Sequence, residues 1–188
     1  FCLLITGIGG LVMIYAGGYL TNKSKADRSR FFTLILLFMT AMLGTVLADN
    51  LLLMILFWEA TSILSFMLVG FDHKSSRSRR AANLALQVTA SGGLALVVSV
   101  LMIGHIIGTY SMSEAVSRGE EIVAHPLGVP VLLGILLAAF TKSAQFPFHF
   151  WLPNAMQAPT PASAYLHSAT MVKLGIYLLA RFEPVIGL

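Results

Sequence analysis

Long apolar runs alternate with short polar segments along the whole chain, and this pattern predicts a bundle of membrane helices. A helix needs about 20 mostly apolar residues to cross hydrocarbon that is roughly 30 Å thick. We therefore predict an all-α, polytopic membrane protein with about six transmembrane helices, at 1–20, 31–48, 51–71, 81–107, 128–150 and 161–182. The fifth is expected to be discontinuous near Pro147, because proline removes a backbone donor and clashes with the preceding turn.

The composition excludes an ordinary soluble domain. Hydrophobic residues make up 57% of the chain and charged residues only 11%, whereas soluble domains usually carry about 25% charged residues. The net charge of +4 reflects two basic clusters, at 23–30 and 74–80, which lie between apolar runs. Such placement is typical of loops beside a membrane, so we expect the lipid bilayer, and not nucleic acid, as the surrounding partner.

The distribution of loop charge also predicts the orientation of the helices. Basic loops tend to remain in the cytoplasm. The loops at 21–30 and 72–80 are separated by two predicted spans, so both can be cytoplasmic. The polar turn at 49–50 and the glutamate-containing segment at 108–127 then lie on the outer side.

Two ionisable residues lie near the middle of predicted spans. Glu59 interrupts the third apolar run, and Lys142 follows fourteen mostly apolar residues in the fifth. A charge at that depth costs about 2.5–3.5 kcal/mol on insertion scales, and such residues commonly mark ion pathways. We expect Glu59 to modulate the pKa of Lys142, so that the lysine can take up and release a proton. A structural ion pair, or a lysine that snorkels to the interface, is the alternative.

The helix break at Pro147 adds to the case for Lys142. Three further prolines follow, at Pro153, Pro159 and Pro161. Carbonyls that are freed inside a bilayer must be satisfied by protein or by water in a cavity. The sequence therefore predicts that water reaches Lys142 beside the break, although a kink that only improves packing would give the same pattern.

Two histidines and a second lysine extend the candidate proton path. Histidine titrates near neutral pH and can relay protons, which makes His149 and His167 candidates. Ser163, His167 and Thr170 share one helix face at i, i+4, i+7 spacing. Lys173 lies six residues beyond His167 and is a candidate for the same cavity or for a neighbouring helix.

No motif for a cofactor or a metal is present in the sequence. Phosphate-loop, dinucleotide-binding, CxxC and HExxH patterns are all missing, so we expect no cofactor and no metal. Haem ligation by His105 and His167 is a weak alternative, because it leaves Glu59 and Lys142 unexplained.

Two long runs carry a family resemblance. They are ADNLLLMILFWEATSILSFMLVGF (48–71) and FTKSAQFPFHFWLPNAMQAPTPASAYLHSATMVKLGIYLL (140–179). Both resemble the antiporter-like subunits of respiratory complex I and of Mrp-type Na⁺/H⁺ antiporters. The match is collinear over most of the chain and implies that 1–188 is a single membrane domain. Because the chain starts at Phe1 inside an apolar run, we expect an internal fragment that resembles transmembrane helices three to eight of a longer subunit.

The resemblance implies roles for four residues. Glu59 would be the glutamate of the family's fifth helix, Lys142 the lysine of its broken seventh helix, and His167 the histidine of the proton path in its eighth. Lys173 falls in ATMVKLG, which is similar to an Mrp pattern. The run at 88–93 is uncharged, whereas complex I subunits have a charged pair there. The chain therefore resembles the large, antiporter-like Mrp subunit more than it resembles a complex I subunit.

These features predict a proton-translocating half-channel of a multisubunit monovalent cation (Na⁺)/proton antiporter in a bacterial or archaeal cell membrane. The expected partners are other antiporter subunits, the bilayer, protons and Na⁺, and the protein would be part of a transporter rather than an enzyme. One alternative is a proton-pumping, antiporter-like subunit of an NADH:quinone oxidoreductase. Another is a structural helix bundle whose charges merely pair.

Overall fold

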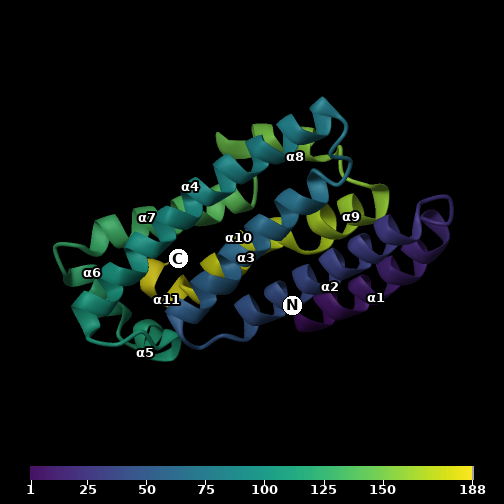
Figure 1. Cartoon of the computed structure of the whole chain (residues 1–188). Coiled ribbons are helices and arrows are strands. Elements are labelled where there is room, and N and C mark those ends of the chain that lie inside the picture. Colours follow the sequence, from purple (N-terminus) through teal and green to yellow (C-terminus); the bar gives the residue numbers. More distant parts are fainter. Residues whose placement is uncertain (188) are drawn as a thin grey trace.

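The computed structural model describes residues 1–187 and shows a bundle of helices that run roughly along one direction (Figure 1). Its first half consists of four long helices: α1 (Cys2–Tyr19), α2 (Lys25–Leu47), α3 (Leu51–Val69) and α4 (Ser76–Ile107). Each of the four is long and apolar enough to cross a membrane. The described residues form no β-sheet, so the all-α membrane bundle predicted from the sequence is confirmed.

Helices α2 and α4 begin earlier than the sequence indicated. The loops predicted at 21–30 and 72–80 are wrong in their second halves, which form the first turns of these helices. Ser24 caps α2 by accepting a hydrogen bond from the backbone N–H of Asp27, and Ser75 caps α4 in the same way through Ser78. A serine cap satisfies a backbone donor that would otherwise lack a partner, so each helix starts beside its serine.

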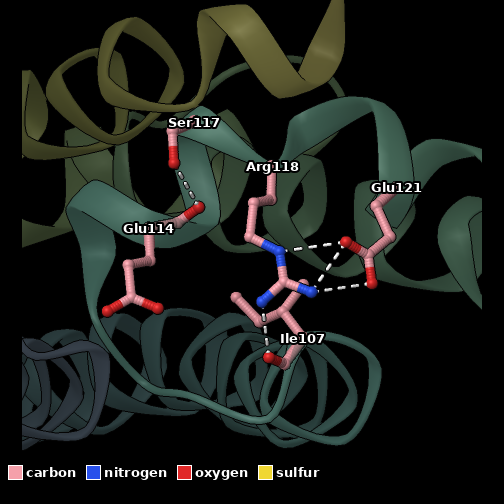
Figure 2. Close-up of polar contacts among 5 residues, drawn as sticks. All are labelled: Ile107, Glu114, Ser117, Arg118 and Glu121. Carbon is pink, nitrogen blue, oxygen red and sulfur yellow. Dashed lines mark hydrogen bonds and ion pairs between the residues drawn. The ribbon is translucent and has the colours of Figure 1, made fainter.

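The segment between α4 and the next long helix contains two short helices, α5 (Met112–Ser117) and α6 (Gly119–Ala124), which were not predicted from the sequence. Arg118 lies between them and joins them to the end of α4 (Figure 2). Its guanidinium donates to the carbonyl of Ile107 at 2.7 Å and forms a bidentate ion pair with Glu121. One side chain therefore fixes the position of the whole segment.

The same segment is tied to the α2–α3 connection. Asp49 accepts hydrogen bonds from the hydroxyls of Ser111 and Ser113, and Asn50 forms an isolated bridge with Ser111. The α1–α2 and α3–α4 connections lie at the opposite end of the bundle (Figure 1). This arrangement agrees with the predicted alternation of loops, whereas the assignment of one end to the cytoplasm stays a prediction.

The fifth predicted span is broken, as expected, but earlier than Pro147. Helix α7 (Gly128–Lys142) ends at Lys142. Ala144 then has a positive φ of 49°, which a continuing helix cannot accommodate. A 3₁₀ turn, η1 (Phe148–Phe150), and the short helix α8 (Trp151–Ala155) complete this stretch.

The sixth predicted span, 161–182, is not one continuous helix. It consists of α9 (Thr160–Ala164), the π-helical turn η2 (Tyr165–Ala169) and α10 (Met171–Arg181), and α11 (Glu183–Ile186) follows it. Thr170 lies outside helical geometry, at φ −127° and ψ −80°, and its hydroxyl donates to the carbonyl of Tyr165 at 2.7 Å. A threonine that bonds back to the preceding turn competes with the backbone ladder, which accounts for the interruption.

Small residues let the central helices approach closely. Helix α4 packs between α3 and α7, and α4 and α7 run side by side in Figure 1. A Cβ at Gly92 would collide with Thr141 of α7, and a Cβ at Gly93 would collide with Glu59 of α3. Gly175 plays the same part where α10 meets α7, against the carbonyl of Ala139. The close packing predicted for the small-residue centre of α4 brings both candidate proton carriers to this one region.

Candidate functional site

Lys142 is fully buried at the end of α7, with 0% of its surface exposed. Its Nζ donates to the hydroxyl of Ser62 at 2.7 Å and to the carbonyl of Trp58 at 3.2 Å. The Trp58 ring also faces the ammonium, at 5.1 Å from Nζ to the ring centroid. Lys142 therefore does not snorkel to an interface, and it is held by the neutral groups of one helix, α3.

Glu59 follows Trp58 in α3 but makes no ion pair with Lys142. Among the described residues, the only ion pair joins Arg118 to Glu121. The Oε1 of Glu59 is buried and has no hydrogen-bond partner in residues 1–187, and it occupies the space that Gly93 leaves free in α4. The structural ion pair considered from the sequence is thus not formed, and Glu59 can act on Lys142 only through space.

Protein groups satisfy the carbonyls at the end of α7. Trp151 of α8 donates its Nε1–H to the carbonyl of Thr141 at 2.9 Å, and the N–H of Gln145 bonds the carbonyl of Phe140 at 2.9 Å. Ser143 donates to the carbonyl of Val172 in α10 at 2.6 Å. The break is therefore a built structure that joins three segments, and these carbonyls have the protein partners that a membrane interior demands.

His167 lies in the π-helical turn, beside the same tryptophan. Its Nδ1 is 3.3 Å from the hydroxyl of Ser163, and its Nε2 is buried without a partner in the described part of the chain. The Trp151 ring packs against the imidazole, with 6.2 Å between ring centroids. Ser163 thus shares a face with His167 as the spacing predicted, whereas the hydroxyl of Thr170 bonds the backbone instead.

The structure does not bring the remaining candidates into this cluster. His149 is exposed and stacks on Phe146, with 6.0 Å between ring centroids. Pro147 is exposed beside it, and Lys173 lies on the exposed face of α10. His105 is exposed in the last turn of α4, so nothing supports the haem alternative, and no cluster of potential metal ligands occurs in residues 1–187.

Two tryptophans are central to the site, and neither had a role predicted from the sequence. Trp58 supplies a carbonyl and a ring face to Lys142, and Trp151 connects the end of α7 to His167. The spacing of Trp58 and Ser62, one helical turn apart, could have indicated a shared face. No sequence signal indicates Trp151, because its contact with Thr141 depends on the irregular backbone at 143–150.

Comparison with known proteins places this geometry in a family. The family described as "NADH:quinone oxidoreductase/Mrp antiporter, TM" matches residues 48–187. The chain belongs to this family. The matched range includes Glu59, the broken helix with Lys142, and His167, and the membership confirms the resemblance seen in the sequence.

Individual members of this family match the whole chain. A probable K(+)/H(+) antiporter subunit, of type A/B, from Rhizobium meliloti (strain 1021) is 53% identical over 187 residues, which is 100% of this chain and 18% of that protein. A "Putative antiporter subunit mnhA2" of Staphylococcus aureus (strain MRSA252) is 50% identical over 188 residues, 100% of this chain and 23% of that protein. The chain thus spans about a fifth of the length of these relatives.

A solved structure has the same fold. A chain in the structure of the Mrp complex from Dietzia sp. DQ12-45-1b superimposes with a TM-score of 0.90 at 40% sequence identity. The superposition covers 99% of this chain and 20% of that one. The family and its apolar helices make this chain part of a multi-pass membrane protein.

Proposed function

We propose that this chain forms a proton-translocating half-channel of a multisubunit monovalent cation/proton antiporter. The observation that carries the proposal is Lys142, which is fully buried at the end of a broken helix and is held by neutral acceptors alone. A lysine that is locked in an ion pair keeps its proton, whereas one that is bound by neutral groups can exist in both protonation states. Membership of the antiporter family supports this interpretation.

Ser62 is suited to both states of the lysine. A hydroxyl accepts a hydrogen bond through its lone pairs and donates one through its O–H. It accepts from the ammonium at 2.7 Å when Lys142 is charged, and it can donate to the lone pair of Nζ when Lys142 is neutral. Glu59, whose Oε1 is free of hydrogen bonds within residues 1–187, modulates this equilibrium by its charge.

His167 is the next station of the proposed path. The imidazole Nε2 and the Glu59 Oε1 are buried polar atoms without partners in the described residues, so each is available to hydrogen-bond with water. Trp151 holds the α7 end and the imidazole in one packed unit. In this proposal a proton moves between Lys142 and His167 through water, while His149 and Lys173 lie further out on the exposed surface.

The cation and the partners follow from the relatives. The printed names include a K⁺/H⁺ antiporter subunit, so the exchanged cation is K⁺ or Na⁺, and we retain Na⁺ as the expectation for this chain. Other antiporter subunits complete the complex, as in the Mrp structure, and the second half-channel lies outside these residues. The basic ends of α2 and α4 face the cytoplasm of a bacterial or archaeal cell.

The proposal is tested in inverted membrane vesicles that contain the full-length complex. A pH gradient is imposed with the respiratory chain inhibited, and its collapse on adding Na⁺ or K⁺ is followed with a pH-sensitive dye. Lys142→Ala should abolish the collapse, whereas Lys173→Ala, which removes an exposed lysine, should retain most of it. Cation-dependent exchange at the normal rate in Lys142→Ala, at equal protein levels, would overturn the proposal. A gradient that responds only to NADH oxidation would favour the redox alternative.

A further inference from the structure

The basic end of the bundle contains an apolar groove with arginines at its rim. The groove encloses about 290 Å³ and lies where the end of α3 meets the first turns of α4. Phe66, Met67, Gly70 and Ala82 form its apolar walls. Arg30, from the start of α2, and Arg79 also line it. None of its lining residues is acidic, so the groove has an apolar floor and a positive rim.

Both guanidinium groups are fixed in place and retain free donors. Arg30 lies over the ring of Phe71, at 5.0 Å from the guanidinium carbon to the ring centroid, and has no ion-pair partner in residues 1–187. Arg79 donates through Nη1 to the carbonyls of His73 and Lys74, at 2.6 and 3.2 Å. An arginine has five N–H donors in a planar fork, so each side chain keeps several for an anion.

We propose that this groove binds one molecule of an anionic phospholipid. Arg30 and Arg79 bind the phosphate, and one acyl chain lies against Met67 and the other apolar walls. The two arginines lie at helix ends, at the depth of the headgroups, whereas the apolar walls lie within the span. A helix from another protein segment would fit the apolar walls equally well, but it would need acidic residues to match the rim. A phospholipid supplies both parts in one molecule.

The charge of the rim provides the first test. The full-length complex is purified in detergent and titrated with phosphatidylglycerol or phosphatidylcholine, and bound lipids are counted by native mass spectrometry. Arg30→Ala/Arg79→Ala should weaken the tightest phosphatidylglycerol site at least tenfold. The matched pair Arg77→Ala/Arg80→Ala removes the same charge from the same end of α4 but outside the groove, and it should leave that site intact. Equal losses in both pairs, or no loss in either, would overturn the proposal, as would equal affinity for phosphatidylcholine.

Two further variants separate the groove from the fold. Arg79 also holds the α3–α4 connection, so its removal could disturb that loop. Met67→Trp keeps both arginines and fills the groove, and it should lose the same lipid. A photoreactive amino acid at position 67, in the full-length complex within cell membranes, should then form an adduct with a phospholipid. An adduct with another polypeptide instead would overturn the proposal, because it would show that a protein segment covers the groove.

Discussion

The ammonium of Lys142 lies 2.7 Å from the hydroxyl of Ser62, and both groups are fully buried. Ser62 is one helical turn beyond Trp58, whose carbonyl accepts the second hydrogen bond from the same ammonium. The lysine at the break of α7 is therefore positioned by the backbone and a hydroxyl of α3. A single helix determines where the proposed proton carrier lies.

Removing the hydroxyl should slow exchange without unfolding the protein. A hydrogen bond to a charged group contributes about 1.5–3 kcal/mol, so Ser62→Ala should lower the exchange rate in vesicles by about tenfold or more. Ser62→Thr retains the hydroxyl and should retain most of the rate. Ser65→Ala is the matched control, because that buried serine bonds only the carbonyl of Ser62 in its own helix. Normal exchange in Ser62→Ala would show that this hydroxyl has no part in transport.

A side chain at Gly93 should displace Glu59. Because a Cβ there collides with Oε1, Gly93→Ala should destabilise the protein by about 1–3 kcal/mol, which is typical of an overfilled interior. Thermal denaturation of the full-length protein in detergent measures this loss. Glu59→Asp, which shortens the side chain, should restore part of it in the double variant. Gly10→Ala in α1 is the control, since a Cβ there meets nothing within 4 Å. Equal stability of both alanine variants would contradict the close approach.

Much of the fold could be predicted from hydrophobic periodicity, and the reasons for the misses are local. The run lengths located the helices, and Pro147 indicated a break. The position of that break at Lys142 could not be predicted, because it depends on Ala144 adopting a positive φ and on Trp151 bonding the carbonyl of Thr141. The interruption at Thr170 was also missed, since a threonine in an apolar run gives the same hydropathy whether or not it bonds back.

The candidate site shows the same division. The cost of burial identified Glu59 and Lys142 without any structure, because charges in apolar runs are conspicuous. Their partners could not be identified in this way. Trp58 presents a carbonyl as well as a ring, and a backbone carbonyl carries no sequence signature. His149 matched the chemistry of a relay, but it lies on the irregular segment after α7, where helical spacing no longer predicts a face.

Trp151 should stabilise the break through its indole N–H. Trp151→Phe keeps an aromatic ring beside His167 and removes the bond to the carbonyl of Thr141. A buried hydrogen-bonding group left without its partner costs about 1–3 kcal/mol. We expect a lower melting temperature and faster amide hydrogen exchange at Ser143 and Ala144. Protection at those amides equal to that of the wild type would show that the indole does not hold the break.

The stability of the outer connection should depend on acid pH through Asp49, which lies between the spans. The hydrogen bond from the Ser113 hydroxyl holds the pKa of this carboxyl below its ordinary value of 3.8. A carboxyl with a lowered pKa contributes stability above its unfolded pKa, and the contribution is lost as the pH falls through the folded value. Asp49→Ala should therefore melt at a lower temperature than wild type at pH 6, and the difference should vanish below about pH 3. A difference that is constant across this range would contradict the assignment.

Exchange by a double variant, Glu59→Gln/Lys142→Gln, provides the sharpest test of whether Lys142 carries the proton. Both charges are removed while the side-chain sizes remain similar, and the melting temperature verifies that the full-length complex is folded. If Lys142 carries the proton, the folded double variant shows no cation-dependent collapse of the pH gradient, and Glu59→Gln alone retains a reduced rate. If the two charges serve only to balance each other within the bundle, the double variant recovers exchange that each single variant lacks, and that recovery would rule out a proton-carrying role for Lys142.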